Sequence, residues 1–294
     1  MKTDYKQLAQ LFTSHHLQQL SQGNFEIVKQ TRSNFFNSNQ ELSIADIFDE
    51  SFKLLSRHYA NEYIYKNLII EKLFLKKYDC DKATVLTEFR VGQRKADCVI
   101  LNGKSICYEI KTEFDSIQRL DSQLKEYEKL FNEIYVVCAP KFTKKLLDDL
   151  PTHIGIIEFN HKLTLKKIRK SNIENFVIDK HLIMQSLRQP EFKMLASQIS
   201  KTLIDVPNTE IYDYCLSIIE NFPNDKKLNK LFIEILKKKR KNDDKTINNF
   251  PISLTNAIIS YNFLKADLRN LTNIMQLKNG ETIDVLSNTS WETT

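Results

Sequence analysis

Three charged residues in a strongly apolar stretch have the types and spacing for joint chemistry. Asp97 lies in the run ADCVIL, and Glu109 and Lys111 end the run SICYEIK, with the two acids twelve positions apart. A charge inside such a strand costs free energy unless it is paired or bound to a metal ion. Two carboxylates on one strand face suit Mg²⁺ with open positions for water and phosphate oxygen, and a lysine can stabilise the charge that develops on phosphate. The pattern predicts metal-dependent phosphodiester hydrolysis.

The hairpin between these two runs decides whether the two acids meet. A two-residue turn at Asn-Gly would pair Leu101 with Lys104 and put Asp97 out of phase with Glu109. A three-residue loop over 102–104, with its glycine in the left-handed conformation, would pair Leu101 with Ser105 and therefore Asp97 with Glu109. The Asn-Gly pair alone favours the first loop, whereas the chemistry requires the second. We therefore expect the odd-numbered residues of both strands, Glu109 and Lys111 included, to share one face.

The apolar periodicity indicates the elements that position these residues. Period-two runs predict strands over 84–90, 96–101 and 105–111, and an all-apolar run predicts a buried strand over 134–139. Apolar residues three and four apart predict helices over 62–78, 116–131 and 141–150, and residues 155–159 and 163–167 could form short strands. The order helix, three strands, helix, strand predicts an α/β fold.

The string Ala96-Asp97 … Glu109-Ile110-Lys111, laid over this order of elements, resembles the PD-(D/E)xK nuclease superfamily. The resemblance covers about residues 60–160 and is strongest to a group of bacterial proteins with a helical C-terminal region. It implies a restriction endonuclease-like mixed sheet flanked by helices, with an α-β-β-β-α-β core, an N-terminal helical extension and a mostly helical C-terminal region. Ala96 replaces the proline of the motif, at a position that many members vary.

The same resemblance implies a role for each matching residue. Asp97, Glu109 and the carbonyl group of Ile110 would bind Mg²⁺ or Mn²⁺, and Lys111 would be the catalytic lysine. Glu71 matches the acid that the first core helix often contributes to the catalytic site.

A second motif follows on the predicted helix 116–131. Gln123 and Tyr127 match the QxxxY element of RecB-like members, and they share a helix face with Arg119. The resemblance implies that these three residues contact the nucleic acid near the site.

Several of these residues also allow a purely structural interpretation. Glu109 and Lys111 could form an edge-strand ion pair, Gln123 could be solvated, and Tyr127 could be a core residue. Glu71 could pair with a neighbouring cation: Lys72, Lys76 or Arg57. Glu88, in the first strand, is a competing metal ligand, which ranks lower because Arg90 lies beside it in phase.

Composition limits the other classes of function. The chain has only 5 glycines in 294 residues and contains neither GxGxxG nor GxxxxGK[ST], so a glycine-rich phosphate loop is not expected. The five cysteines lack CxxC spacing and lie among Val and Ile, which indicates core positions in a reducing compartment rather than disulfides or a zinc site. The polar N-terminus lacks a hydrophobic signal region, so we expect a cytoplasmic protein without a membrane partner.

Charge divides the chain into a neutral and a basic part. Residues 1–160 hold 22 Lys+Arg and 22 Asp+Glu, whereas residues 161–294 hold 21 and 15, so the net charge of +6 lies in the second part. The excess suits contact with a phosphate backbone, and a solvated lysine-rich helix face is the open alternative. We expect an N-terminal helical extension over 1–45, a nuclease-like core over 46–160, a basic helical region over 161–280 and a flexible tail over 281–294.

Together these observations predict a Mg²⁺- or Mn²⁺-dependent nuclease that acts on nucleic acid, with DNA favoured. By analogy with the superfamily, its context would be bacterial defence or DNA repair. The first alternative is a non-catalytic nucleic-acid-binding or adaptor module that keeps the nuclease fold and acts within a complex. The second is a core that acts only as a homodimer or with a partner protein, joined through the N-terminal helices.

Overall fold

The computed structural model describes residues 4–37, 41–160, 162, 164–174 and 176–277. These residues form two compact units, each described by itself below. The helical unit comprises the described parts of Met1–Asn67 and Asp243–Thr294, and the sheet unit comprises those of Leu68–Asn242. The predicted segments 1–45, 46–160 and 161–280 divide the chain at other positions and stay predictions. The predicted tail 281–294 lies outside the described residues.

The helical unit is built from short helices at both ends of the chain. In α4, Ser43 and Asp46 form a capping box that satisfies N–H groups of the first turn. Ser21 Oγ donates to Asp267 Oδ1 at 3.1 Å and thereby joins α2 to α14. The elements are α1 (Tyr5–Ala9), η1 (Gln10–Phe12), α2 (Ser14–Ser21), α3 (Glu26–Phe35), α4 (Ile44–His58), α5 (Glu62–Ile69, which continues into the sheet unit), α12 (Asp244–Ile247), η3 (Ile252–Leu254), α13 (Thr255–Ser260) and α14 (Lys265–Met275).

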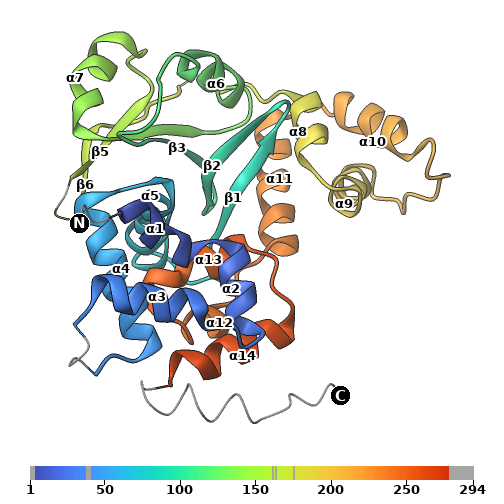
Figure 1. Cartoon of the computed structure of the whole chain (residues 1–294). Helices are drawn as coiled ribbons and strands as arrows, with labels where there is room; N and C mark the ends of the chain where they lie inside the picture. The colour runs from blue at the N-terminus through green and yellow to red at the C-terminus, as the bar shows by residue number, and fades with distance from the viewer. Residues whose placement is uncertain (1–3, 38–40, 161, 163, 175, 278–294) are drawn as a thin grey trace. The chain divides into compact units, whose positions relative to one another are not determined.

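The sheet unit contains one six-stranded mixed sheet in the order β1-β2-β3-β4-β5-β6 (Figure 1). The pairs β1–β2, β2–β3 and β5–β6 are antiparallel, and the pairs β3–β4 and β4–β5 are parallel. The predicted mixed α/β fold with helices on either side in the sequence is therefore confirmed. The strands are β1 (Thr84–Val91), β2 (Arg94–Leu101), β3 (Ser105–Lys111), β4 (Glu133–Cys138), β5 (Gly155–Asn160) and β6 (Thr164–Arg169).

The helices of the sheet unit include one irregular segment. η2 (Ile70–Leu75) continues α5 as a π-helix, so the predicted helix over 62–78 ends near Leu75. The predicted helix over 116–131 is reduced to α6, and a turn in which the side chain of Asp115 accepts from the N–H and hydroxyl of Thr112 lies before it. The remaining helices are α6 (Leu120–Tyr127), α7 (Pro140–Asp149), α8 (Lys180–Ser186), α9 (Gln189–Ser200), α10 (Ile211–Glu220) and α11 (Asp225–Lys239).

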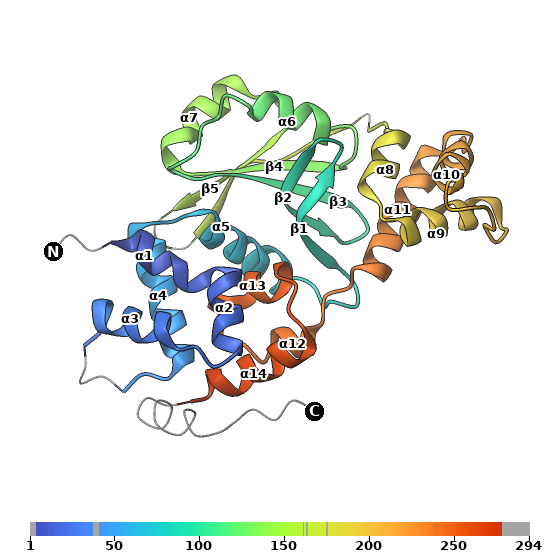
Figure 2. The same cartoon turned by 45° about the vertical axis from the view of Figure 1, so that its right-hand side comes forward.

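The core of this unit lies between the sheet and its helices. α6 and α7 cover the same face of the sheet in both views (Figures 1 and 2). The apolar cluster beneath them includes Val99, Cys107, Leu124 and Val136. All five cysteines are buried, which confirms their core positions. Among the described residues, no helix combines the length and the apolar character needed to cross a membrane.

The β2–β3 hairpin has the register that the chemistry requires. Leu101 pairs with Ser105, so the loop is the three-residue one over 102–104. Gly103 has a φ of +101°, a conformation that L side chains rarely adopt. This glycine therefore sets the phase of the two strands, and the expected register is confirmed.

Candidate active site

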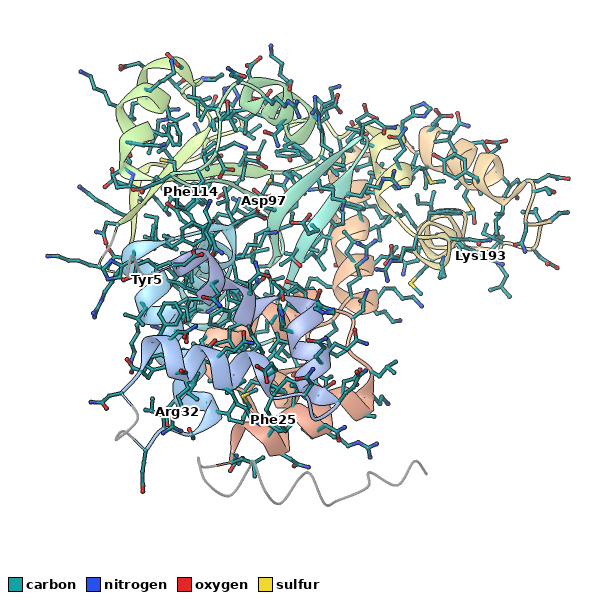
Figure 3. All side chains as sticks on the ribbon, in the orientation of Figure 1. Tyr5, Phe25, Arg32, Asp97, Phe114 and Lys193 are labelled. Atoms are coloured by element: carbon teal, nitrogen blue, oxygen red, sulfur yellow. The ribbon has the colours of Figure 1, made fainter. Side chains whose placement is uncertain are left out.

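Asp97 and Glu109 lie on neighbouring strands at the end of this register. The pairing of β2 with β3 runs to Cys98 and Tyr108, and one further step in the same register brings Asp97 opposite Glu109. Asp97 Oδ2 accepts the backbone N–H of Ile110 at 2.7 Å, which fixes its carboxylate beside β3. Figure 3 labels Asp97 on β2.

Glu109 and Lys111 form a buried ion pair on one face of β3. Lys111 Nζ lies 2.7 Å from Glu109 Oε1, and the two residues are only 8% and 1% exposed. Lys111 Nζ also donates to Gln123 Oε1 at 3.2 Å. The predicted sharing of a face is thus confirmed, and α6 supplies the amide that orients the lysine.

Tyr127 lies behind this ion pair, one helical turn after Gln123. Its hydroxyl is 3.1 Å from Glu109 Oε2 and 2.8 Å from the carbonyl oxygen of Lys95. A phenol has one proton to donate, so these two acceptors share a single donor, and the shorter contact is to Lys95. Glu109 therefore receives less hydrogen bonding than its number of neighbours suggests.

The electrostatics of the cluster follow from its burial. Burial raises the pKa of Glu109 above its usual value, and the charge of Lys111 with the hydrogen bonds from Lys111, Tyr127 and Gln123 only partly offsets this effect. Burial, followed by the negative charge of Glu109, raises the pKa of Tyr127 far above its ordinary value. The charge of Asp97 acts on Tyr127 in the same direction, which places both carboxylates near one hydroxyl group.

The predicted nucleic-acid contacts occupy different environments. Tyr127 is fully buried, which favours a positioning role behind Glu109 over direct contact with a substrate. Gln123 is half-buried, and Arg119 is exposed at the N-cap of α6. The roles of these three residues in nucleic-acid binding stay predictions, and Arg119 has the exposure that such a role needs.

Glu71 pairs with Lys76, the residue that follows η2. Its Oε1 lies 2.8 Å from Lys76 Nζ, which is one of the three ion pairs that the sequence allowed. The structure thus shows an ion pair here, and the assistance of Glu71 to the catalytic site stays a prediction.

Glu88, which the sequence ranked as a weaker candidate ligand, lies beside Asp97. It stands opposite Asp97 in the β1–β2 register, and the two residues have carboxylate oxygens within 4.8 Å of each other. Arg90 donates its Nε to the carbonyl of Gly92, and Lys95 Nζ is 4.0 Å from Glu88 Oε2. The signal that could have found this proximity is the hairpin register of β1 with β2, which places residue 88 against residue 97.

The backbone at Glu88 is also unusual. Its φ is +51°, a left-handed conformation inside a strand at a residue that is not glycine. Such a conformation costs about 1–3 kcal/mol and persists only where the surrounding structure enforces it. The strained backbone of Glu88 therefore lies next to Asp97 in the β1–β2 hairpin.

The donor atoms of this region fit a hard divalent cation. Asp97 and Glu88 offer carboxylate oxygens close to each other, and Glu109 carries a further carboxylate on the neighbouring strand. Carboxylate oxygen is the ligand type that Mg²⁺ and Mn²⁺ prefer. Glu109 is buried and weakly supplied with donors, and a nearby cation would stabilise its charged form. The carbonyl of Ile110 stays a predicted ligand.

Comparisons with known proteins give a matching family, one curated protein with a similar sequence and one solved structure. A family model described as Bacteriophage P4 protein cII matches residues 55–271. Protein cII of Enterobacteria phage P4 is 33% identical over 159 residues, which are 52% of this chain and 58% of that protein, so the chain spans less than two thirds of its length. A protein of unknown function from Silicibacter pomeroyi, SPO1766, matches 40% of this chain and 80% of its own, at 17% identity and a TM-score of 0.29.

Proposed function

The chain belongs to the bacteriophage P4 protein cII family, and we propose that it is a metal-dependent nuclease that hydrolyses phosphodiester bonds, above all in DNA. The observation that carries this proposal is the meeting of three groups at one end of the β2–β3 hairpin. Asp97 is tied to the backbone beside Glu109, and Glu109 holds the ammonium of Lys111 at 2.7 Å. The resemblance of these residues to the PD-(D/E)xK motif supports the same chemistry.

In this proposal each residue has a task that its surroundings suit. Asp97 and Glu109 hold the cation, with Glu88 as a further carboxylate beside Asp97. Bound Mg²⁺ or Mn²⁺ would polarise the phosphate group. Lys111, oriented by Gln123, places its ammonium where negative charge develops and where a water can be held. Glu71 would assist the catalytic site, and Arg119 would contact the nucleic acid. The proposed context is bacterial defence or DNA repair.

One observation favours a second candidate function. Glu109 is almost completely buried and already paired with Lys111. A closed ion pair of this kind can be purely structural, as in a module that keeps the nuclease fold and binds nucleic acid without cleaving it. A cleavage assay separates the two candidates.

The test is cleavage of double-stranded DNA, single-stranded DNA and RNA with Mg²⁺, with Mn²⁺ and with EDTA. Asp97→Asn and Lys111→Met remove the proposed machinery. Asp121→Asn and Lys125→Met are matched controls, because they make the same changes in an exposed ion pair on α6. We expect metal-dependent cleavage by the wild type and both controls, and none by the two site variants. Equal cleavage by the wild type and Asp97→Asn would refute the proposal.

A further inference from the structure

We propose that Phe114 stacks on an unpaired base of the substrate strand, and that this contact makes single-stranded nucleic acid the preferred substrate of the candidate active site. The inference rests on the proposed function, because it names the substrate class of the same site. Phe114 is 57% exposed, the largest fraction for any phenylalanine, tyrosine or tryptophan among the described residues. It lies three residues after Lys111 and is labelled in Figure 3.

The position of Phe114 follows from the end of β3. The strand ends at Lys111, and three further residues of chain span at most about 11 Å. The parallel strands β3, β4 and β5 have their carboxyl ends at this edge of the sheet, which is where ligands bind in sheets of parallel strands. The ring is therefore within reach of the bases next to a phosphate group held at Lys111.

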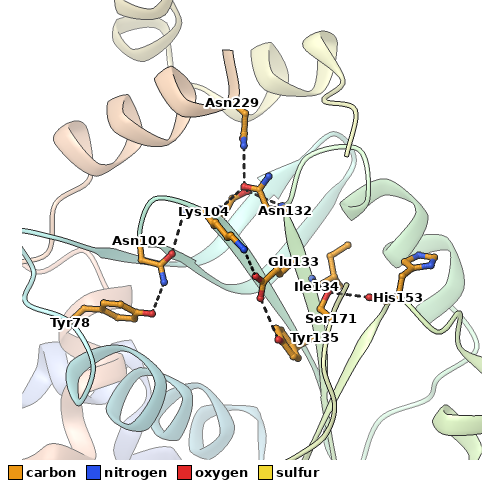
Figure 4. A network of polar contacts seen from close by, with 11 residues as sticks. Tyr78, Asn102, Lys104, Asn132, Glu133, Ile134, Tyr135, His153, Ser171 and Asn229 are labelled. Carbon is orange, nitrogen blue, oxygen red and sulfur yellow. Dashed lines mark hydrogen bonds and ion pairs between the residues drawn. The ribbon is translucent and has the colours of Figure 1, made fainter. Parts of the chain in front are cut away.

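The amino ends of the same strands are occupied by contacts within the protein. Asn132 Oδ1, before β4, accepts the backbone N–H of Ser105 at 2.9 Å and its hydroxyl at 3.0 Å. The same oxygen accepts from Asn229 Nδ2 at 3.0 Å, which adds α11 to the network (Figure 4). These polar groups already pair with one another, whereas the carboxyl edge presents the exposed ring of Phe114.

Hydrogen bonds fix the loop that carries Phe114. The carboxylate of Asp115 accepts the N–H and the hydroxyl of Thr112 at 2.8 and 2.6 Å, and the same hydroxyl accepts the N–H of Phe114 at 3.2 Å. From the first turn of α7, Lys141 Nζ donates to the carbonyl oxygen of Glu113. A ring displayed on a loop fixed in this way loses little entropy on binding, which favours a ligand contact.

The neighbours of Phe114 favour a base over a phosphate group. Glu113 and Asp115 flank the ring, both residues are exposed, and their negative charges repel phosphate. Arg119, exposed at the N-cap of α6, can supply the positive charge for the next phosphate group. An aromatic face accepts any base by stacking, but a base inside a duplex must first leave its own stack at a cost in free energy. The ring therefore selects an unpaired base.

The first experiment detects the stack without cleavage. Phe114→Trp is combined with Trp291→Phe, so that the new tryptophan is the only one in the chain. A short oligothymidylate is added with Ca²⁺, which accepts looser oxygen geometry than Mg²⁺, and a gel checks that the DNA stays intact. The matched control is Val177→Trp with Trp291→Phe. Val177 is 69% exposed and lies near the other end of α6, where the N–H of Asp179 donates to the carbonyl of Lys129.

We expect the oligonucleotide to quench the fluorescence of the Phe114→Trp protein and to leave that of the Val177→Trp protein unchanged, because direct contact with a base quenches an indole ring. This readout needs no cleavage, so it holds even where the nuclease proposal fails. Equal quenching in the two proteins, no quenching at saturating DNA, or no binding of the DNA would overturn the proposal.

The second experiment measures the preference for single strands. In Phe114→Ala, the KM for single-stranded DNA should rise about 5- to 150-fold, the loss expected for one stacked base, with kcat nearly unchanged. The KM for duplex DNA of the same sequence should change less. Phe114→Tyr and Val177→Ala should keep the values of the wild type.

Two outcomes separate this inference from the proposed function. If the wild type cleaves duplex DNA at least as well as single strands, or if Phe114→Ala raises both KM values equally, the single-strand preference is refuted and the nuclease proposal stands. If no substrate is cleaved, the nuclease proposal fails. The affinities for the two forms of DNA, measured with Ca²⁺ by fluorescence anisotropy, then replace KM and carry the same expected ratios.

Discussion

Two buried ion pairs in the sheet unit have similar separations, but the pKa values of their glutamates are shifted in opposite directions. Glu109 and Lys111 are 2.7 Å apart, and Glu191 and Arg240 are 2.6 Å apart. Both glutamate side chains are almost inaccessible to solvent, at 2% and 3% exposure. Yet the pKa of Glu109 lies above its ordinary value and that of Glu191 lies below it.

Burial and hydrogen-bond donors together explain this difference, because Glu109 lies deeper among protein atoms than Glu191 and has weaker donors. Arg240 donates Nε and Nη2 to the two oxygens of Glu191 at 2.7 and 2.6 Å, and the N–H of Arg188 adds a bond at 2.7 Å. Burial alone would raise the pKa of Glu191, but these donors outweigh it. Glu109 has one ammonium, which also bonds Gln123, a hydrogen bond from Gln123, and a phenol proton that also serves the carbonyl of Lys95. The Glu191–Arg240 pair, called the clamp below, is a fully hydrogen-bonded structural pair, whereas the Glu109–Lys111 pair lacks positive charge that a cation could supply.

The largest expected effect is on the cleavage rate, which should depend on the Glu109–Lys111 pair and not on the Glu191–Arg240 pair. Lys111→Met should lower metal-dependent cleavage at least about a thousandfold, because charge stabilisation at the phosphate is lost. Arg240→Met should keep cleavage near that of the wild type at temperatures where it remains folded. Steady-state cleavage rates on the preferred nucleic acid measure both. If the two variants lost activity equally, the functional distinction between the pairs would be wrong.

The next largest expected effect is the loss of unfolding free energy when the Glu191–Arg240 pair is broken. Arg240→Met should lower the free energy of unfolding by about 3 kcal/mol, because it leaves Glu191 buried without its charged partner. Arg94→Met, which removes an exposed contact to Ser122, should change it by less than about 0.5 kcal/mol. Urea denaturation of the full chain gives both values. A loss below that of the control would show that the clamp contributes nothing.

The pH dependence of the clamp follows from the lowered pKa of Glu191. Its stabilisation is fully present above the ordinary glutamate pKa of 4.5 and is lost as the pH falls through the lower pKa of the folded state. The difference in unfolding free energy between the wild type and Arg240→Met should therefore shrink below pH 4.5. Urea midpoints at a series of pH values test this, and a constant difference would contradict it.

The gain in stability on binding of Mg²⁺ at the Asp97–Glu109 site should be smaller than these effects. At about ten times its Kd, Mg²⁺ should stabilise the wild type by about 1.4 kcal/mol. Asp97→Asn should lose this gain, whereas Asp121→Asn, at the exposed pair on α6, should keep it. Thermal unfolding with Mg²⁺ and with EDTA is the measurement. Equal stabilisation of all three proteins would place the cation elsewhere.

The smallest effect concerns the shared phenol. Tyr127→Phe should lower the free energy of unfolding by about 1 kcal/mol, because the carbonyl of Lys95 loses its buried donor. Tyr63→Phe is a comparison from the helical unit, since the hydroxyl of Tyr63 also donates to a carbonyl group, that of Ser253. Similar losses in the two variants are expected from denaturant titration. A much larger loss at Tyr127 would mean that its main bond is to Glu109.

Features set by local sequence were predictable. Strand alternation and the three-residue loop place Asp97, Glu109 and Lys111 on one face, and the helical spacing of Gln123 and Tyr127 brings both to the same cluster. The period of each element and the length of one turn decide which of these side chains share a face, and both can be read from the sequence.

Features that depend on irregular backbone or on distant chain segments were not predictable. The π-helix of η2 changes the angular spacing around Glu71, which pairs with Lys76. The left-handed conformation of Glu88 leaves no signal in its residue type. The clamp of Glu191 and Arg240 joins residues 49 positions apart. In each case tertiary contacts outweigh the local preference.

The lysines of β6 have a consequence for self-association. β6 is the last strand of the sheet, and the backbone groups on its outer side have no strand partner within it. Such an edge can recruit a strand from another copy of the chain, and lysine side chains oppose this by repulsion and hydration. Lys166 and Lys167 are both exposed on β6. Replacing both with neutral β-branched residues would therefore make concentrated solutions prone to aggregate, even where each fold remains intact.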